Sequence, residues 1–284
     1  MDKIKITCDS TCDLSPELCE KYDIEMIPLS ITLGEESYRD GIDIQSQDVY
    51  SYASGSGQLP KTAAVSVGGY ESVFAKYVGE GYSVIHINIS SDFSSCYQNA
   101  CLAAEEVGNV YPFDSRNLSA GSGYYAIAAK ELADTGCCST IEEILGKLEE
   151  IKQKINVSFV IQTLDFLKMG GRCSSVAALG ANLLKIRPEI LVRDGKMTVG
   201  KKYRGNRVQS IAAYIRGKLE GRDDIDLSRA FVLHGGLPEE EFRNALDLVR
   251  ELQPFEEIFT GTVGCTIASH AGPDVLGILF LTKK

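Results

Sequence analysis

Apolar, β-rich runs alternate with helical patterns through the first half of the chain, and this alternation limits the fold more than any other feature. Helices between successive strands are typical of βαβ units, whose strands form a mainly parallel sheet. We expect strands at residues 3–8, 24–33, 82–89 and 109–113, and helices within residues 14–22, 46–54, 70–81, 95–107 and 119–135. The intervening residues 34–44 and 55–69 are expected to form a polar turn and a loop.

A different pattern follows the long amphipathic helix expected at residues 140–155. Residues 186–205 resemble a hairpin, because the Asp194-Gly195 pair favours a type I′ turn. Further strands are expected at 157–163, 231–236, 258–261 and 275–282, with helices at 164–171, 174–184, 206–219 and 238–252. This mixture predicts an α+β domain with a mixed sheet. We therefore expect two domains, an α/β domain at residues 1–155 and an α+β domain at residues 156–284.

The bulk composition excludes several classes of function. The 284 residues carry a formal net charge of −10, which argues against electrostatic binding of nucleic acid or of an anionic membrane surface. No apolar stretch approaches the roughly 20 residues that span a bilayer, and residues 1–10 lack the apolar region of a secretion signal. We expect a cytoplasmic protein without an integral membrane segment.

The nine cysteines do not form a recognisable framework. Their number is odd, and they are scattered through expected helices and strands, which is unlike a set of structural disulfides. No CxxC spacing occurs, and only three histidines accompany them, so no metal site is expected. Most should be buried, reduced thiols. Cys96 lies in a serine-rich turn before a helix, where the pKa of a thiol can be lowered.

Short polar phrases follow apolar runs at four places and suggest a binding site. They occupy residues 8–11, 89–98, 168–172 and 269–273. In the second phrase, four serines between positions 90 and 95 separate a strand from a helix. The first N–H groups of a helix have no partner within the helix, and together with hydroxyls they favour an anion. The sequence therefore predicts a protein that binds a ligand with an anionic head.

Individual residues in these phrases each have a functional and a structural interpretation. Ser94 is either a donor to an anion or an ordinary helix cap. Thr62 is either a ligand donor or part of a turn. Arg172 follows two glycines. It either binds an anionic ligand group, a carboxylate or a phosphate, or it donates to the last carbonyls of a helix. His270 is either a pocket donor or proton relay or a structural histidine.

Two alternatives from other functional classes remain open at this point. A serine-dependent hydrolase or acyltransferase could use Ser94 as nucleophile, His270 as base and Asp9 or Asp114 as the orienting group. No GxSxG elbow, Walker A loop or GxGxxG fingerprint supports an enzyme. The other alternative is a regulatory module that binds phosphate or a sugar phosphate.

The phrases in combination resemble the DegV family of bacterial fatty-acid-binding proteins, which includes the binding subunits of fatty acid kinase. The matching elements are DST near the N-terminus, the PKT–S loop, ISSxxS–YQ, FDS–SAGSG, L–GGR and HAGP. The resemblance covers residues 3–282. It implies two domains, the first a three-layer α/β/α unit, that clamp one long-chain fatty acid (C14–C18) in an apolar tunnel with the carboxylate at the domain interface. Residues 176–184 are a candidate tunnel wall.

The resemblance also implies roles for particular residues. Thr62 and Ser94 match the family's carboxylate-binding residues, and Arg172 and His270, with Ser66 and Ser95, would complete the head-group network. The binder itself would not be a catalyst and would need no cofactor or metal. It would present the carboxylate to a separate ATP-dependent kinase subunit. The chain departs from the family pattern in three places: the family's TSQPS is TAAVS here, its SGT is Ser-Ser-Cys, and its HxGPG ends in aspartate.

Overall fold

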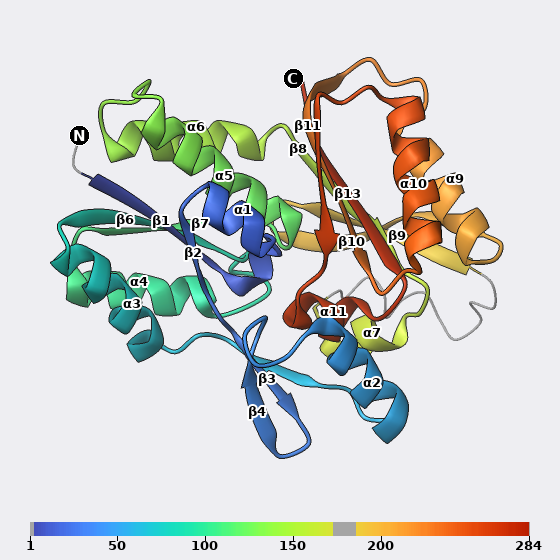
Figure 1. The fold of residues 1–284 in the computed structure, drawn as a ribbon, viewed down its shortest axis with the longest axis horizontal. Coiled ribbons are helices and arrows are strands. Elements are labelled where there is room, and N and C mark those ends of the chain that lie inside the picture. The colour runs from blue at the N-terminus through green and yellow to red at the C-terminus, as the bar shows by residue number, and fades with distance from the viewer. Residues whose placement is uncertain (1–2, 173–185, 284) are drawn as a thin grey trace.

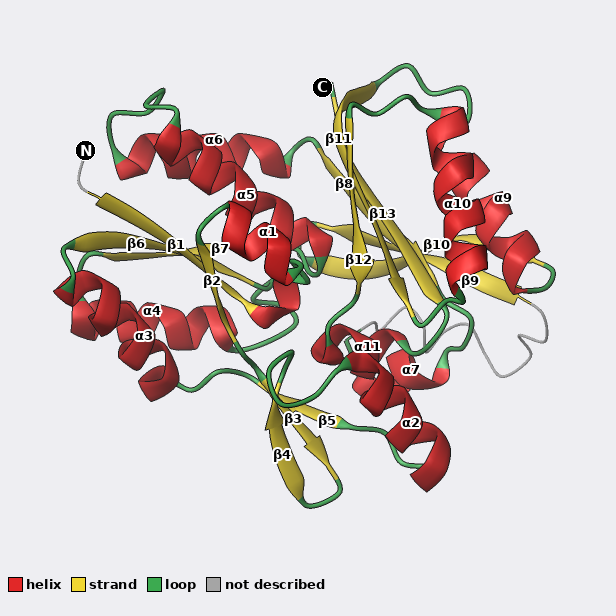
Figure 2. Cartoon of the chain, in the orientation of Figure 1, coloured by secondary structure: helices red, strands yellow, loops and turns green. Residues whose placement is uncertain are grey.

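The first half of the chain builds a four-stranded parallel sheet between two layers of helices (Figures 1 and 2). The computed structural model describes residues 3–172 and 186–283. The sheet has the order β2 (Ile24–Ile27), β1 (Lys3–Asp9), β6 (Tyr82–Asn88) and β7 (Val110–Asp114). Helices α3 (Val67–Gly79) and α4 (Cys96–Val107) cover one face, and α1 (Pro16–Lys21), α5 (Ala120–Asp134) and α6 (Ile141–Lys152) lie on the other. The predicted α/β class of this half is confirmed.

A small antiparallel sheet below the parallel one was not predicted. It contains β3 (Ser30–Leu33), β4 (Glu36–Arg39) and β5 (Lys61–Ala63), and α2 (Ser46–Ser56) lies between β4 and β5 in sequence. The single strand expected at 24–33 is wrong, because the chain leaves the parallel sheet after Ile27. Pro28 follows at once, and proline has no N–H to continue a ladder. The expected turn and loop at 34–44 and 55–69 therefore contain the other two strands.

The second half builds a six-stranded mixed sheet, as predicted. Its order is β10 (Lys196–Arg204), β9 (Ile186–Arg193), β8 (Ile155–Val160), β13 (Val275–Thr282), β11 (Ile225–Gly235) and β12 (Glu257–Thr262). Only β11 and β12 pair in parallel. The β9–β10 turn has φ angles of 49° at Asp194 and 78° at Gly195, which fit the predicted type I′ geometry.

The two faces of the mixed sheet have different partners. Helices α9 (Arg207–Leu219) and α10 (Glu239–Leu252) cover one face (Figure 2), where Tyr214 and Phe280 belong to one buried cluster. Residues on the opposite face belong to a cluster that continues into the parallel-sheet half, and the rings of Tyr124 and Phe231 lie 6.2 Å apart. The division of the chain at residue 155 stays a prediction, because this cluster extends across it.

Two short helices lie near the end of the mixed sheet, beside α2 (Figure 1). Helix α7 (Asp165–Gly170) falls within the helix expected at 164–171. Helix α11 (Cys265–Ala271) was not expected, because most of its residues are buried and no amphipathic pattern marks it. The helix expected at 174–184, and with it the candidate tunnel wall at 176–184, lies outside the described residues.

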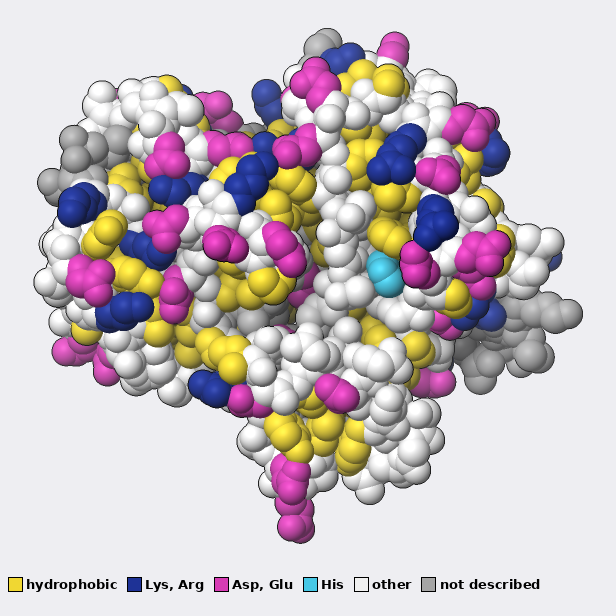
Figure 3. All heavy atoms as spheres, in the orientation of Figure 1, with side chains coloured by type: hydrophobic (Ala, Val, Ile, Leu, Met, Phe, Trp, Pro, Cys, Tyr) yellow, Lys and Arg dark blue, Asp and Glu magenta, His cyan; other side chains and the backbone are white. Residues whose placement is uncertain are grey.

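The distribution of charged side chains on the surface agrees with the net negative charge of the chain. The face in Figure 3 shows acidic and basic side chains interspersed over both halves, without a broad basic patch. Within residues 3–172 and 186–283, no helix has the length and apolar character to cross a membrane.

The tip of the β9–β10 hairpin touches the parallel-sheet half. The Ser90 hydroxyl donates to the Gly195 carbonyl at 2.9 Å, and Arg116 donates to the Asp194 carbonyl. A Cβ atom on Gly195 would lie 2.5 Å from the Arg116 guanidinium and 2.7 Å from the Ser90 hydroxyl oxygen. The tip is therefore a tight contact between the halves, and a Cβ at Gly195 would require the Arg116 guanidinium and the Ser90 hydroxyl to move.

Replacing Gly195 with alanine should cost more free energy of unfolding than the backbone conformation alone explains. Gly221 is a matched control, because its φ is 67° and a Cβ there would meet no atom within 4 Å. We expect Gly221→Ala to cost about 1 kcal/mol and Gly195→Ala to cost roughly 1–3 kcal/mol more through overpacking. Urea denaturation measures both, and equal losses would contradict the close contact.

Candidate functional site

Thr62, Ser94, Arg172 and His270 come from four distant parts of the chain and line one pocket, which we call the polar pocket. Its volume is about 520 Å³, part of it open to solvent. Thr62 belongs to β5, where it pairs with Ile31 of β3. The rest of the lining is Leu29, Ala63, Ala64, Ile89, Phe93, Leu118, Met197, Thr266 and Ile267. The unexpected small sheet is therefore what brings Thr62 to the pocket.

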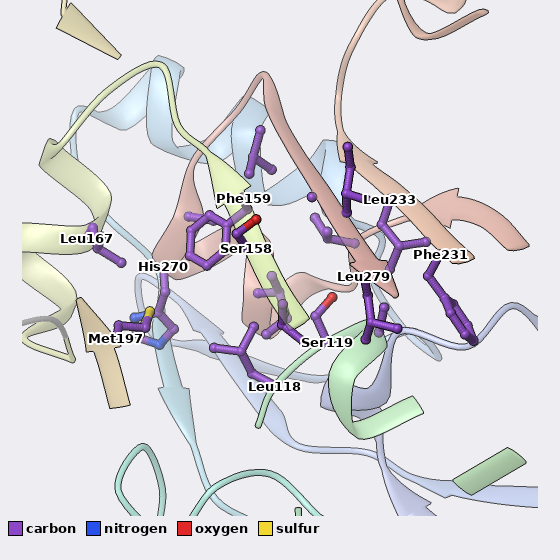
Figure 4. A pocket seen from close by; sticks show the side chains of 18 residues that line it. Leu118, Ser119, Ser158, Phe159, Leu167, Met197, Phe231, Leu233, His270 and Leu279 are labelled. Carbon is purple, nitrogen blue, oxygen red and sulfur yellow. The ribbon is translucent and has the colours of Figure 1, made fainter. Parts of the chain in front are cut away.

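A second pocket, the apolar pocket, lies against the mixed sheet on the face turned toward the parallel-sheet half. Its volume is about 590 Å³, again partly open to solvent. Strands β8, β11 and β13 form one wall, and α11 and the start of α5 form others. Figure 4 shows His270 and Met197 at one end of this group of side chains and Phe231 and Leu233 at the other. Its few polar groups include Ser119 and Ser158, whose hydroxyls bond to Asp13 and Tyr214.

The two pockets adjoin each other. Leu118, Met197, Ile267 and His270 line both. A ligand could therefore place a polar end among Thr62, Ser94 and Arg172 and an apolar end against the sheet. This combination suits an amphipathic molecule better than a wholly polar one.

His270 stands at the junction of the pockets. Its Nε2 lies 2.9 Å from the Thr62 hydroxyl oxygen. Burial, and to a smaller extent the nearby Arg172 cation, lower the pKa of His270 to about 4, so its imidazole is neutral at pH 7. Its Nδ1 is buried and has no hydrogen-bond partner among the described residues.

The double glycine before Arg172 has two separate functions. A Cβ atom on Gly170 would lie 2.4 Å from Nδ1 of His270, so α7 can approach the imidazole only with glycine there. Gly171 ends α7 with a φ of 68°, a left-handed conformation that favours glycine. Arg172 then donates to the carbonyls of Gly170 at 2.6 Å and Phe93 at 3.4 Å. Within the described residues its guanidinium forms no ion pair with a carboxylate, so its charge stays available to the polar pocket.

Ser94 lies at the start of α4 and at the edge of the polar pocket. Its Oγ accepts from the Cys96 backbone N–H at 3.3 Å and lies 3.1 Å from the Cys96 sulfur, while its side chain also lines the polar pocket. The expectation for Cys96 is wrong. Burial, followed by the Asp9 carboxylate, raises the pKa of this thiol to about 12.

Ser66 and Ser95, which were predicted to complete the head-group network, line neither pocket. Ser66 is exposed, and its hydroxyl caps α3 by accepting from the Gly69 N–H at 3.2 Å. Ser95 is exposed at the N-cap position of α4 and forms no side-chain cap there. Successive residues at a helix start point in different directions, so only Ser94 of the adjacent pair reaches the pocket.

The geometry does not assemble the hydrolase alternative. Ser94 contacts Cys96 rather than His270, and His270 contacts Thr62. The proposed orienting carboxylates are engaged elsewhere. Asp9 binds His86, Tyr70, Asn88 and the N–H of Ile89, and Asp114 binds Ser91 and Arg116. A nucleophile needs its base within hydrogen-bond reach, and the described contacts of Ser94 include no such base.

Two carboxyl groups that sequence reasoning missed, those of Asp40 and Asp13, hold α11 in place. Both oxygens of Asp40, a 3 % exposed residue, accept bonds: from the N–H of Cys265 at 2.8 Å, and from the N–H and hydroxyl of Thr266 at 3.2 and 2.7 Å. The Ser10 hydroxyl also donates to Asp40 at 3.0 Å. Asp13 accepts from the Gly264 N–H at 2.9 Å and from Ser119. The sequence predicted only a polar turn around Asp40. It could not indicate that Asp40 binds α11, because α11 itself was not predicted.

The comparisons with known proteins agree with the fold. Residues 3–283 match the family model described as "Uncharacterised protein, DegV family". The chain belongs to the DegV family. A DegV domain-containing protein of Clostridium perfringens is 34% identical over 286 residues, with 100% of each chain covered. Two solved structures are similar: a DegV family protein from Thermus thermophilus, described as fatty acid binding (TM-score 0.87, 29% identity, 99% of each chain), and a stearic acid-binding protein from Eubacterium ventriosum (TM-score 0.84, 28% identity, 99% and 98%).

Replacing Asp13 with asparagine should flatten the pH dependence of stability. Burial and the nearby Asp40 carboxylate raise the pKa of Asp13 to about 8, although its two hydrogen bonds lower it. Between about pH 4 and pH 8 the folded protein therefore holds a proton that the unfolded chain has lost, and its free energy of unfolding falls as pH rises. Asparagine carries no such proton, so this contribution, at most about 1.4 kcal/mol per pH unit, disappears.

Urea denaturation at several pH values between about 5 and 8 tests this linkage. The difference in unfolding free energy, Asp13→Asn minus unaltered protein, should grow as pH rises. Parallel curves for the two proteins would show that the Asp13 carboxyl is ionised in the folded state.

Proposed function

We propose that this protein is a cytoplasmic carrier of one long-chain fatty acid, C14–C18. The carboxylate would accept hydrogen bonds from Thr62 and Ser94 in the polar pocket, and the acyl chain would lie in the apolar pocket. The observation that carries the proposal is that the two pockets share Leu118, Met197, Ile267 and His270. The fatty acid binding described for the similar DegV proteins supports it.

The physical chemistry of the two pockets suits this ligand. Charge-assisted hydrogen bonds from hydroxyls can hold a carboxylate without neutralising it. The Arg172 guanidinium, which has no carboxylate partner within the described residues, supplies a favourable field for an anion. Burial of each methylene contributes about 0.8 kcal/mol, so a long chain offsets the entropy lost on binding. Residues 1–155 and 156–284 would then act as two domains that close on the ligand from either side.

We further propose that the protein is not itself a catalyst and presents the carboxylate to a separate ATP-dependent fatty acid kinase subunit. Arg172 is exposed at the polar pocket, so the carboxylate end of the ligand would face the surface. Loaded protein, ATP and such a kinase subunit should yield an acyl phosphate, which hydroxylamine converts to a measurable hydroxamate. Acyl-ester turnover by the protein alone that is lost in Ser94→Ala would instead favour a hydrolase.

Extraction and reloading tests the carrier function. Native mass spectrometry of the purified protein should show one bound fatty acid, and organic extraction followed by lipid analysis should identify it. The delipidated protein should take up palmitate or oleate again. An empty protein that refuses both would contradict the proposal, and a tightly bound polar anion without lipid would support the phosphate-binding alternative.

The Ser94→Ala variant should retain palmitate more weakly than the unaltered protein. A hydrogen bond to a charged group contributes about 1.5–3 kcal/mol, which corresponds to roughly a tenfold to hundredfold rise in Kd. Ser95→Ala is the matched control, because the adjacent serine is exposed and lines neither pocket. Fluorescent fatty acid displacement measures both Kd values. Equal affinities in the two variants would show that Ser94 does not bind the carboxylate.

A further inference from the structure

A pair of adjacent cysteines, Cys137 and Cys138, lies in the connection between α5 and α6 and lines neither pocket. Among the eight cysteines that the described residues include, Cys137 alone is exposed; the others are buried or half-buried. Cys138, next to it, is 2 % exposed and belongs to the core of the parallel-sheet half. An exposed thiol beside a buried one places two sulfurs of different reactivity within reach of each other.

Polar groups surround the Cys137 sulfur and favour its thiolate. The Thr135 hydroxyl lies 3.1 Å from this sulfur. The ammonium of Lys147, a residue of α6, lies 3.5 Å from it. The Thr135 hydrogen bond, with smaller contributions from Cys138 and Lys147, lowers the pKa of Cys137. A thiolate that is exposed and close to a cation is the reactive form of cysteine.

Several other thiols show the opposite tendency. Burial raises the pKa of Cys12, Cys19, Cys96, Cys101 and Cys265. Burial also raises the pKa of Cys138, whose sulfur lies 3.9 Å from that of Cys137. Among the cysteines of residues 3–172 and 186–283, Cys137 thus combines exposure with a lowered pKa, and a second thiol lies beside it.

We propose that Cys137 and Cys138 form a reversible redox site that hydroperoxides oxidise. The Cys137 thiolate would attack the terminal oxygen of the hydroperoxide, forming an S–O bond and breaking the O–O bond. The departing alkoxide or hydroxide takes a proton and leaves as alcohol or water. The Cys138 thiol then loses its proton and attacks the sulfenic sulfur, so an S–S bond forms and the hydroxyl leaves as a second product, water. Two thiols are oxidised and one hydroperoxide is reduced.

The geometry of neighbouring residues makes the oxidised form easy to reverse. Adjacent Cα atoms are about 3.8 Å apart across a trans peptide, whereas disulfides usually join Cα atoms about 4.4–6.8 Å apart. A bond between Cys137 and Cys138 is therefore strained, and strained disulfides have more oxidising potentials. Such a bond serves a reversible response better than it serves structural stabilisation.

Peroxide titration followed by peptide mass spectrometry tests the proposal on the full-length protein, delipidated and fatty-acid-loaded in parallel. Low concentrations of hydrogen peroxide should convert Cys137 and Cys138 to a form lighter by two hydrogen atoms and closed to alkylation, and dithiothreitol should reverse it. In Cys138→Ser, the sulfenic acid at Cys137 should persist and react with dimedone. Persistence of that sulfenic acid in the unaltered protein would overturn the role of Cys138.

Variants of the surrounding groups separate a tuned thiolate from a merely exposed thiol. Lys147→Met and Thr135→Val keep Cys137 exposed and should slow its reaction with peroxide by roughly threefold to tenfold. Lys202→Met, at an exposed lysine on β10, is the charge-matched control and should react at the unaltered rate. Equal rates of the reaction with peroxide in all these proteins would overturn the proposal. So would a Cys137 thiol that stays reduced while other cysteines are oxidised.

Discussion

The buried carboxylate of Asp40 is the interaction on which the arrangement of the site depends. It accepts three bonds from the first turn of α11 and one from Ser10, which itself accepts the N–H of Leu29 at 3.1 Å. A buried carboxylate is costly unless it is hydrogen-bonded, so these bonds form as a set. They join the first strand–helix connection, the small sheet and the mixed-sheet half. The same α11 carries His270, whose ring meets Thr62 of that small sheet.

The two pockets follow from how the halves are joined rather than from either sheet alone. The mixed sheet uses one face for α9 and α10, and the other face is left for α5, α11 and the apolar pocket. The polar pocket adjoins this region and includes Ser94 from the connection between β6 and α4 of the parallel-sheet half. This agrees with the tendency of ligands in α/β proteins to bind beyond the carboxyl ends of the strands. The polar pocket and the apolar pocket therefore adjoin each other, and Arg172 of the polar pocket stays at the surface.

Periodicity predicted the two main sheets because long elements bury a regular face. It failed at β3, β4 and β5, which have three or four residues each, and at α11, which is too fully buried to be amphipathic. Thr62, Ser94, Arg172 and His270 could be named from motif resemblance, and they line one pocket. Ser66 and Ser95 could not be excluded, because a serine at a helix start has the same local sequence whether it caps or binds. The Lys147–Cys137 contact depends on a loop geometry that no sequence pattern specifies.

The buried cluster that crosses between the halves has a consequence for how the molecule unfolds. Phe231 and Phe159 of the mixed sheet share this cluster with Tyr124 and Leu118 of the other half. Separating the halves would expose these side chains together as one large apolar face, which an isolated domain in water rarely tolerates. The two sheets therefore gain stability from each other and should lose it in one cooperative transition. Each half, although it contains a complete sheet, should therefore be less stable alone than in the intact chain.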